Sequence, residues 1–240
     1  DKFLCDNNIG TRSQVKEYIK KGQVTVNDQI IKKPETKVNE ETDTVVCQGQ
    51  PIHYRKYVYY MLNKPEGVVS ATNDNTAPTV VSLLTVPEQK DLFPVGRLDK
   101  DTEGLLLLTD DGPLGHALLS PKNHVDKVYY AKVEGRLDRT DAEALAAGMV
   151  LGDGLHCLPA ELEPLGDGSQ CHVTLREGKY HQVKRMLAAR GKPVVYLKRL
   201  SMGPIALDPA LAPGEWRPLT GEEKALLRRG TAGDPGFSAF

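Results

Sequence analysis

The stretch GRLDKDTEGLLLLT, residues 96–109, joins a charged loop to a continuous apolar run. In an extended segment Arg97 and Asp99 point to one side, while Leu98 between them turns inward. The four leucines predict a short buried strand, and Gly104 lets the backbone enter that strand tightly. An Arg-x-Asp pair by itself is also common in solvated loops, but charged groups at the mouth of a buried strand favour a chemical role.

A second copy of the same tetrapeptide, at residues 135–138, shows how much the context matters. It is followed by Thr140 and Glu143 at capping-box spacing and by an alanine-rich run, which predicts a helix. Asp138 therefore belongs to a turn before a helix, with no buried strand behind it. The information lies in the longer context of the first copy.

Residues 178–187, GKYHQVKRML, have the spacing of a helix with Val183, Met186 and Leu187 along one stripe. Lys184 lies at the border of that stripe. From there its long stem can cross apolar surface and bring an ammonium group to a half-buried acid. Between the two segments, residues 126–133 alternate as in a strand.

Five motifs occur in a characteristic order, and together they resemble those of the pseudouridine synthases. They are LNKPxG at 62–67, GRLDxxTxG at 96–104, KxY at 127–129, GKYHQVKRM at 178–186 and RxxxG at 199–203. The resemblance is to the branch that modifies ribosomal RNA and carries a small S4-type RNA-binding domain at its N-terminus. It covers about residues 1–220.

The resemblance implies an enzyme that detaches uracil from its ribose nitrogen, rotates the base and reattaches it through carbon. Asp99 matches the essential aspartate of the family and Tyr129 its active-site tyrosine, whose ring can stack on uracil. Lys184 is the candidate cation that keeps Asp99 ionised. Whether Asp99 attacks the sugar or removes a proton is left open by the sequence. Isomerisation requires no redox partner, so neither a cofactor nor a metal is expected.

RNA contacts are expected from several basic residues. A uridine in folded RNA must be extruded, and the planar guanidinium of Arg97 is suited to fill the vacated stack. Lys64, His181 and Arg199 match positions that would hold backbone or phosphate. The remaining RNA-binding candidates are Arg12, Lys16, Lys20 and Arg185. Between residues 176 and 199 eight Lys or Arg stand against one Glu, which predicts one strongly basic face on a chain of net charge −1.

The length of 240 residues, with 40% hydrophobic and 26% charged residues, fits one medium domain and one small domain. We expect an S4-like domain at 1–52, a linker within 49–57, a catalytic domain at 57–220 and a flexible tail at 221–240. No apolar run approaches the roughly 20 residues of a membrane span, and no leader is recognisable. The four cysteines are scattered, as in reduced cytoplasmic proteins, and a monomer is expected.

The expected fold class is α+β. In the first domain two helices, near 1–8 and 11–21, precede a hairpin of 24–26 and 29–31. Asp28 occupies the turn position where S4 domains usually have glycine, so a strained or longer turn is expected. In the second domain three helices, near 113–119, 141–147 and 180–190, pack on a mixed, mostly antiparallel sheet with short strands around positions 68, 105, 128, 158, 173 and 194.

Three alternatives remain. The chain could be a non-catalytic RNA-binding factor in ribosome assembly, or a glycoside or nucleoside hydrolase that uses Asp99 and Asp101 as paired carboxylates. If it is a synthase, its substrate could be large-subunit (23S) RNA, although the segment 73–79 favours the small-subunit (16S) type. Either RNA, or an assembly intermediate that contains it, is the expected partner.

Overall fold

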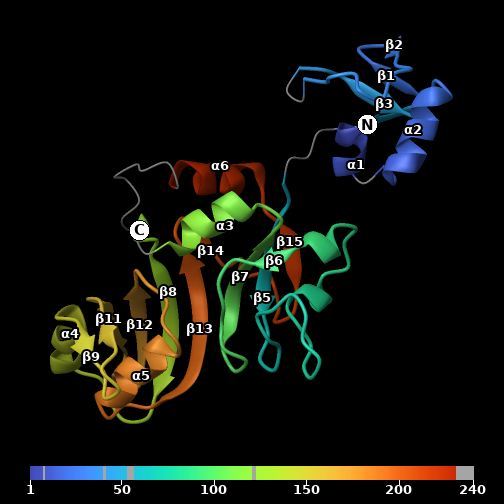
Figure 1. Cartoon of the computed structure of the whole chain (residues 1–240). Coiled ribbons are helices and arrows are strands. Elements are labelled where there is room, and N and C mark those ends of the chain that lie inside the picture. Colours follow the sequence, from blue (N-terminus) through green and yellow to red (C-terminus); the bar gives the residue numbers. More distant parts are fainter. Residues whose placement is uncertain (8, 40–41, 53–56, 121–122, 231–240) are drawn as a thin grey trace. The chain divides into compact units, whose positions relative to one another are not determined.

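The computed structural model describes residues 1–7, 9–39, 42–52, 57–120 and 123–230, and the chain divides into two compact units, Asp1–Val58 and Tyr59–Phe240 (Figure 1). The expected linker at 49–57 is partly wrong, because strand β4 (Gln50–Ile52) pairs with strand β3 (Val45–Cys47). Residues 53–56 of that linker lie outside the described residues.

The first unit packs two helices, α1 (Lys2–Asp6) and α2 (Arg12–Lys20), with a four-stranded antiparallel sheet of order β2-β1-β3-β4. Its core contains buried apolar residues from both layers, among them Leu4, Val15 and Val45. Strands β1 (Val24–Val26) and β2 (Gln29–Ile30) form the expected hairpin.

The hairpin turn does not need to be longer than two residues. Asn27 and Asp28 both have positive φ, 49° and 64°, as in the type I′ turn that matches the twist of paired strands. Asn27 supports the turn, since its amide donates to Asp43 Oδ1 at 2.9 Å and accepts from the backbone NH of Thr44 at 2.9 Å. These hydrogen bonds stabilise the two-residue turn, although Asp28 occupies the second turn position, where S4 domains usually have glycine.

The second unit is built on a nine-stranded mixed sheet, and its α+β class agrees with the expectation. The main path of the sheet runs β11-β12-β8-β13-β7-β5-β15, with β6 paired to β7 and β14 to β13. The strands are β5 (Tyr59–Lys64), β6 (Phe93–Pro94), β7 (Glu103–Thr109), β8 (Lys127–Val133), β11 (Glu161–Leu165), β12 (Gln170–Leu175), β13 (Val194–Met202), β14 (Ile205–Ala206) and β15 (Trp216–Pro218). Two shorter strands, β9 (Met149–Val150) and β10 (His156–Cys157), pair separately.

Three helices of this unit lie where the sequence predicts them, with local differences. Helices α3 (Gly112–Leu119), α4 (Arg139–Ala146) and α5 (Gln182–Ala189) are those expected, and short 3₁₀ turns lie at Val81–Leu83 and Gln89–Asp91. The capping box of α4 is formed by Asp138 and Asp141, not by Thr140 and Glu143. The strand expected around position 68 is reduced to a single bridge between Val69 and Thr79.

The pairing of β7 with β13 is parallel, whereas the other pairs of named strands in the described residues are antiparallel. It takes place at Gly104, which pairs with Arg199. Gly104 has φ of +101°, and a Cβ there would lie 2.2 Å from the carbonyl oxygen of Arg199. Only glycine therefore permits this approach of the two backbones.

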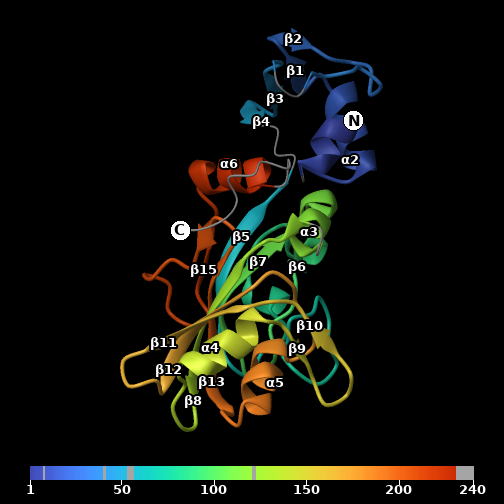
Figure 2. The ribbon, with the colours of Figure 1, turned by 90° about the vertical axis from the view of Figure 1, so that its left-hand side faces the viewer.

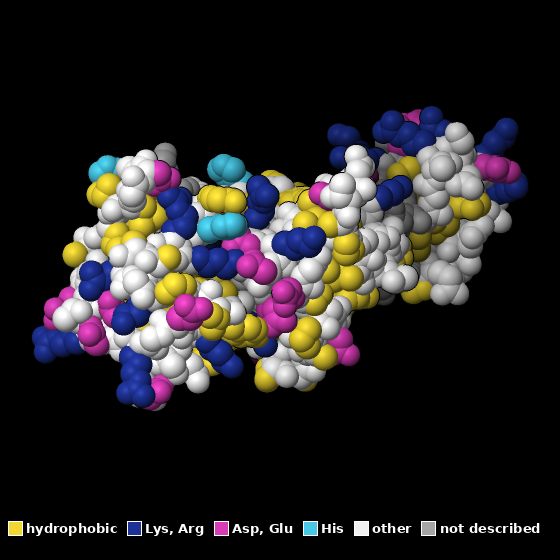
Figure 3. Space-filling model, turned by 90° about the horizontal axis from the view of Figure 1, so that it is seen from below, with side chains coloured by type: hydrophobic (Ala, Val, Ile, Leu, Met, Phe, Trp, Pro, Cys, Tyr) yellow, Lys and Arg dark blue, Asp and Glu magenta, His cyan; other side chains and the backbone are white. Residues whose placement is uncertain are grey.

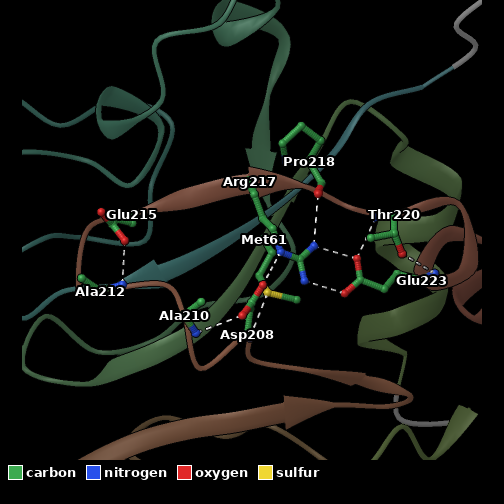
Figure 4. Close-up of polar contacts among 9 residues, drawn as sticks. All are labelled: Met61, Asp208, Ala210, Ala212, Glu215, Arg217, Pro218, Thr220 and Glu223. Carbon is green, nitrogen blue, oxygen red and sulfur yellow. Dashed lines mark hydrogen bonds and ion pairs between the residues drawn. The ribbon is translucent and has the colours of Figure 1, made fainter.

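The flexible tail expected at 221–240 is wrong for its first half, because Gly221–Gly230 forms helix α6 (Figure 4). Thr220 and Glu223 form a reciprocal cap, in which each accepts from the other's backbone NH. Arg217 on β15 binds both carboxylate oxygens of Glu223 at 2.8 Å and Asp208 at 2.7 Å. Leu227 is buried, so the helix has an apolar anchor that its polar composition concealed. Residues 231–240 lie outside the described residues.

Figures 1 and 2 show that α3 and α6 lie toward one end of the large sheet and α5 toward the other. The loop of residues 96–102, here called the Asp99 loop, leads into β7 at the end near α5. The two segments that the sequence singled out thus meet at one end of the second unit.

Candidate active site

The Asp99 loop is fixed from several sides. Ser70 Oγ donates to the carbonyl oxygen of Leu98 at 2.8 Å and accepts from the NH of Leu98 at 2.9 Å. The NH of Thr102 donates to the carbonyl oxygen of Asp99 at 3.1 Å. Leu98 itself is buried, as its inward orientation predicts. The loop is thus a preorganised support for the Asp99 side chain.

Lys64 holds the same loop from inside the protein. Its side chain is 0% exposed, and its ammonium donates to the carbonyl oxygens of Pro65 at 3.0 Å, Thr102 at 2.9 Å and Lys100 at 3.4 Å. Burial lowers the pKa of Lys64 to about 8, while the nearby carboxylates of Asp101 and Asp99 oppose this shift. A direct contact between Lys64 and RNA is therefore excluded by burial, whereas the expected role of holding backbone agrees with its contacts.

Arg199 is also buried, so a direct contact with RNA is excluded in the same way, whereas the expected role of holding backbone agrees with its contact. Its Nε donates to the carbonyl oxygen of Leu105 at 2.7 Å, beside the close approach at Gly104. A motif that marks functional residues does not distinguish those that face the substrate from those that support them.

Helix α5 brings Lys184 to the Asp99 loop. Its buried stripe contains Val183, Met186 and Leu187, as the spacing predicts. Lys184 Nζ lies 3.0 Å from Asp99 Oδ2 and 2.6 Å from Asp101 Oδ1.

The sequence did not reveal that one ammonium serves two carboxylates. Asp99 and Lys184 are 24% and 20% exposed, whereas Asp101 is 65% exposed. Burial alone would lower the pKa of Lys184, but its hydrogen bonds to Asp101 and Asp99 raise it above the ordinary value. The hydrogen bond from Lys184 lowers the pKa of Asp101. The shared cation leaves these two carboxylates poorly suited to act as the independent acid and base of a hydrolase.

Tyr129 faces Asp99 across a small cleft. Its side chain is buried on the inner face of β8, in the alternation that the sequence predicts. The cleft has a volume of about 50 Å³ and is lined by Asp99, Tyr129, Arg97 and His181, with apolar residues from α5 and the sheet. Because pockets that enclose a whole ligand are larger, a base would be held on some of its sides only. Arg97 is exposed at this cleft.

His181 supplies a second nitrogen next to the carboxylate. Its Nε2 lies 3.4 Å from Asp99 Oδ1. The residue precedes α5 with φ of +51°, a left-handed conformation that is uncommon outside glycine. The structure thus brings Asp99, Lys184, Tyr129, Arg97 and His181 together from three separate segments, the Asp99 loop, β8 and the start of α5.

Glu177, which the sequence analysis did not select, fixes the segment before α5. It accepts hydrogen bonds from Gln182 Nε2 at 2.7 Å and from the NH of Leu158 at 2.8 Å, and it pairs with Lys179 at 2.9 Å. Burial alone would raise the pKa of Glu177, but these hydrogen bonds hold it below its ordinary value. In the sequence, the only indication of this role is that Glu177 is the single acidic residue in the basic stretch 176–199.

The strongly basic face predicted from residues 176–199 does not form as expected. Five of its eight cations have carboxylate partners: Arg176 with Asp126, Lys179 with Glu177, Lys184 with Asp99 and Asp101, Arg185 with Asp153, and Arg190 with Asp141. Figure 3 shows this end of the second unit, where basic, acidic and histidine side chains lie among one another. Carboxylates, most of them distant in the sequence, thus pair with the greater part of this basic stretch.

The basic candidates of the first unit lie on α2. Arg12, Lys16 and Lys20 are all exposed. In the described part of the chain, no group of three or more His, Cys, Asp or Glu side chains is arranged to hold a metal ion. Within the same ranges, no helix has the length and apolar character needed to cross a membrane.

A carboxylate that contacts a lysine and lines a cleft together with a tyrosine, on a mixed sheet that follows a small α/β unit, is the arrangement that the resemblance implies. The chain belongs to the RNA pseudouridylate synthase family, whose family model matches residues 58–189, and an S4 domain matches residues 1–45. It is therefore a pseudouridine synthase, an isomerase, as the resemblance implied.

Particular relatives span nearly the whole chain. An uncharacterized RNA pseudouridine synthase, YtzG, of Bacillus subtilis is 48% identical over 95% of this chain and 97% of its own length. Ribosomal small subunit pseudouridine synthase A of Escherichia coli is 41% identical over 95% of this chain and 98% of its own. A crystal structure of a pseudouridylate synthase matches with 38% identity and a TM-score of 0.68, covering 94% of this chain and 97% of that one.

Proposed function

We propose that this enzyme converts one uridine of small-subunit (16S) ribosomal RNA to pseudouridine, with Asp99 as the reacting carboxylate. The observation that carries the assignment of Asp99 is its contact with Lys184, 3.0 Å away, at a cleft shared with Tyr129. The choice of RNA is supported by the relatives named for the small subunit, which are 39–43% identical over almost their full length.

In the proposed reaction the bond between ribose C1′ and uracil N1 breaks and a bond between C1′ and C5 forms. Asp99 acts at the sugar, either by attack on C1′ or by removal of a neighbouring proton. The proton on C5 leaves after the new carbon–carbon bond has formed, and N1 gains a proton, so the overall change is an isomerisation. No oxidant or energy source is required.

The neighbouring residues have separate roles in this proposal. Lys184 binds and orients the carboxylate, and Tyr129, which lines the cleft, stacks on the base and carries a proton. Arg97, exposed at the cleft, fills the stack that the extruded uridine leaves. Arg12, Lys16 and Lys20 on the first unit, with Arg185 on α5, contact RNA phosphates. Lys64 and Arg199 hold the backbone and do not touch RNA.

The enzyme is further proposed to act as a cytoplasmic monomer on ribosomal RNA or on an assembly intermediate, without a membrane partner. The domain boundaries proposed for these roles are 1–52 for RNA binding and 57–220 for catalysis.

The test uses transcripts of both ribosomal RNAs labelled with tritium at uracil C5, because the isomerisation releases this tritium to water. We expect one equivalent of tritium per small-subunit RNA and none from Asp99→Asn. Release from the large-subunit RNA alone would refute the proposed substrate. Free uracil would indicate hydrolysis instead, and RNA binding without release would indicate a silent assembly factor.

Arg97→Ala tests the extrusion role. It should slow the reaction on folded RNA far more than on a short unstructured oligonucleotide. Equal losses on both would assign Arg97 to the bond-breaking step.

A further inference from the structure

Tyr180, immediately before His181, is the most exposed large hydrophobic side chain among the described residues, at 75%. Its ring stacks on the His181 ring, with centroids 3.8 Å apart and an angle of 17° between the planes. Here the imidazole covers one face, and the large exposed area leaves the other face open to solvent.

The pair is held in place by the segment that carries it. His181 adopts a left-handed backbone, and its carbonyl oxygen accepts from the NH of Arg185 at 2.9 Å in the first turn of α5. Gln182 Oε1 accepts from the NH of Lys179 at 3.0 Å, while Gln182 Nε2 donates to the buried Glu177. A non-glycine residue persists in this conformation only where its surroundings fix it. The rigid turn presents the aromatic pair without a further ordering cost.

The pair is continuous with the active site. His181 touches both the reactive carboxylate, 3.4 Å from Asp99 Oδ1, and the Tyr180 ring. A base in the cleft beside Asp99 is therefore separated from the open face of Tyr180 by the imidazole. Neighbouring bases of an RNA strand that has been opened for extrusion lose their stacking partners and expose their own faces.

We propose that Tyr180 is a stacking platform for an unpaired RNA base next to the target uridine. The inference rests on the proposed function, since it requires the target to occupy the cleft at Asp99. Stacking on an aromatic side chain is worth about 1–3 kcal/mol per base. This corresponds to about 5- to 150-fold in affinity.

The experiment compares Tyr180→Ala, Tyr180→Leu and Tyr180→Phe on a small-subunit RNA fragment that wild type modifies. Phe keeps the aromatic face and should stay within about twofold of wild type in KM and Kd. Ala removes the ring, and Leu keeps apolar bulk without a flat face. Both should raise KM and Kd by about 5- to 150-fold. Val195→Ala, at another exposed apolar side chain of the second unit, is the control and should have no effect.

Abasic RNAs separate stacking from a structural role. One nucleotide at a time on either side of the target loses its base, and a double-mutant cycle is measured with each. At one position the abasic RNA should bind wild type as weakly as Tyr180→Ala binds intact RNA, and the Ala substitution should then have no further effect. An equal loss from Tyr180→Ala on the intact RNA and all abasic RNAs, or Leu as effective as Phe, would overturn the proposal.

Failure of the proposed function would be visible separately. If wild type releases no tritium from small-subunit RNA, the substrate assignment fails. If wild type reacts and Tyr180→Ala retains wild-type KM and Kd, only the platform fails.

Discussion

Lys184→Met removes the cation that lies between two carboxylates while keeping the length and apolar stem of the side chain. The contact with Asp99 is about one-quarter exposed, and a hydrogen bond to a charged group in such a setting contributes about 1.5–3 kcal/mol. The contact with Asp101 is mostly exposed and contributes less than about 1 kcal/mol. The free energy of unfolding should therefore fall by about 1.5–4 kcal/mol, which leaves a folded protein.

The effect on catalysis should be larger than the effect on stability. Loss of 1.5–3 kcal/mol at the reacting carboxylate alone slows the reaction about 10- to 150-fold. Without the ammonium, Asp99 and Asp101 also repel each other, and the carboxylate loses its fixed orientation. We expect the single-turnover rate to fall at least about 100-fold.

The assay is tritium release with enzyme in excess, which reports the chemical step without product release. Urea unfolding of the same samples gives the stability change, and RNA binding gives Kd. Lys184→Arg keeps the charge and should retain more activity than Lys184→Met. Asp101→Asn removes only the exposed partner and should cost less than tenfold. A folded Lys184→Met enzyme with turnover within threefold of wild type would refute the role of this cation.

Three further predictions concern the scaffold. Gly104→Ala should destabilise the protein by about 3–5 kcal/mol in urea unfolding, because its Cβ meets the Arg199 carbonyl oxygen at positive φ; a loss below 1 kcal/mol would refute this. Lys64→Met leaves buried carbonyl oxygens unpaired, so it should lower the free energy of unfolding by about 2–4 kcal/mol and also lower the activity. An unchanged urea midpoint would show that the fold does not depend on the contacts of Lys64. Arg217 lowers the pKa of Glu223, so this carboxylate stabilises the fold above its unfolded pKa of about 4.3, and the stabilisation is lost as pH falls through the lower folded pKa. The melting temperature of Glu223→Gln should thus lie below that of wild type at pH 7 and approach it below pH 4, and a constant difference would contradict the linkage.

Local rules of sequence predicted much of the fold. The buried strand after Asp99, the stripe of α5 and the alternation around Tyr129 follow from periodicity, which burial enforces directly. Helix α6 was not predicted, because Leu227 is a single buried apolar residue in a mostly charged segment. The ion pair that holds the helix, between Glu223 and Arg217 on β15, is a tertiary contact.

The site was predictable in its members but not in their surroundings. The resemblance to the family's motifs selected Asp99, Tyr129 and Lys184, which the fold brings together, yet it did not show that Lys64 and Arg199 face the interior. The stretch 176–199 is basic in sequence, but ion pairs with distant segments, such as Arg190 with Asp141, compensate much of its charge in the folded protein. Such pairings depend on tertiary contacts that a single sequence does not specify.

The parallel junction of β7 and β13 also bears on the order of events during translation. Arg199 reaches Leu105 across 94 residues of sequence. When the ribosome has made the Asp99 loop and β7, the strand β13 that pairs with β7 has not yet been synthesised. The complete junction therefore forms late in synthesis, once the segment near residue 200 has left the exit tunnel.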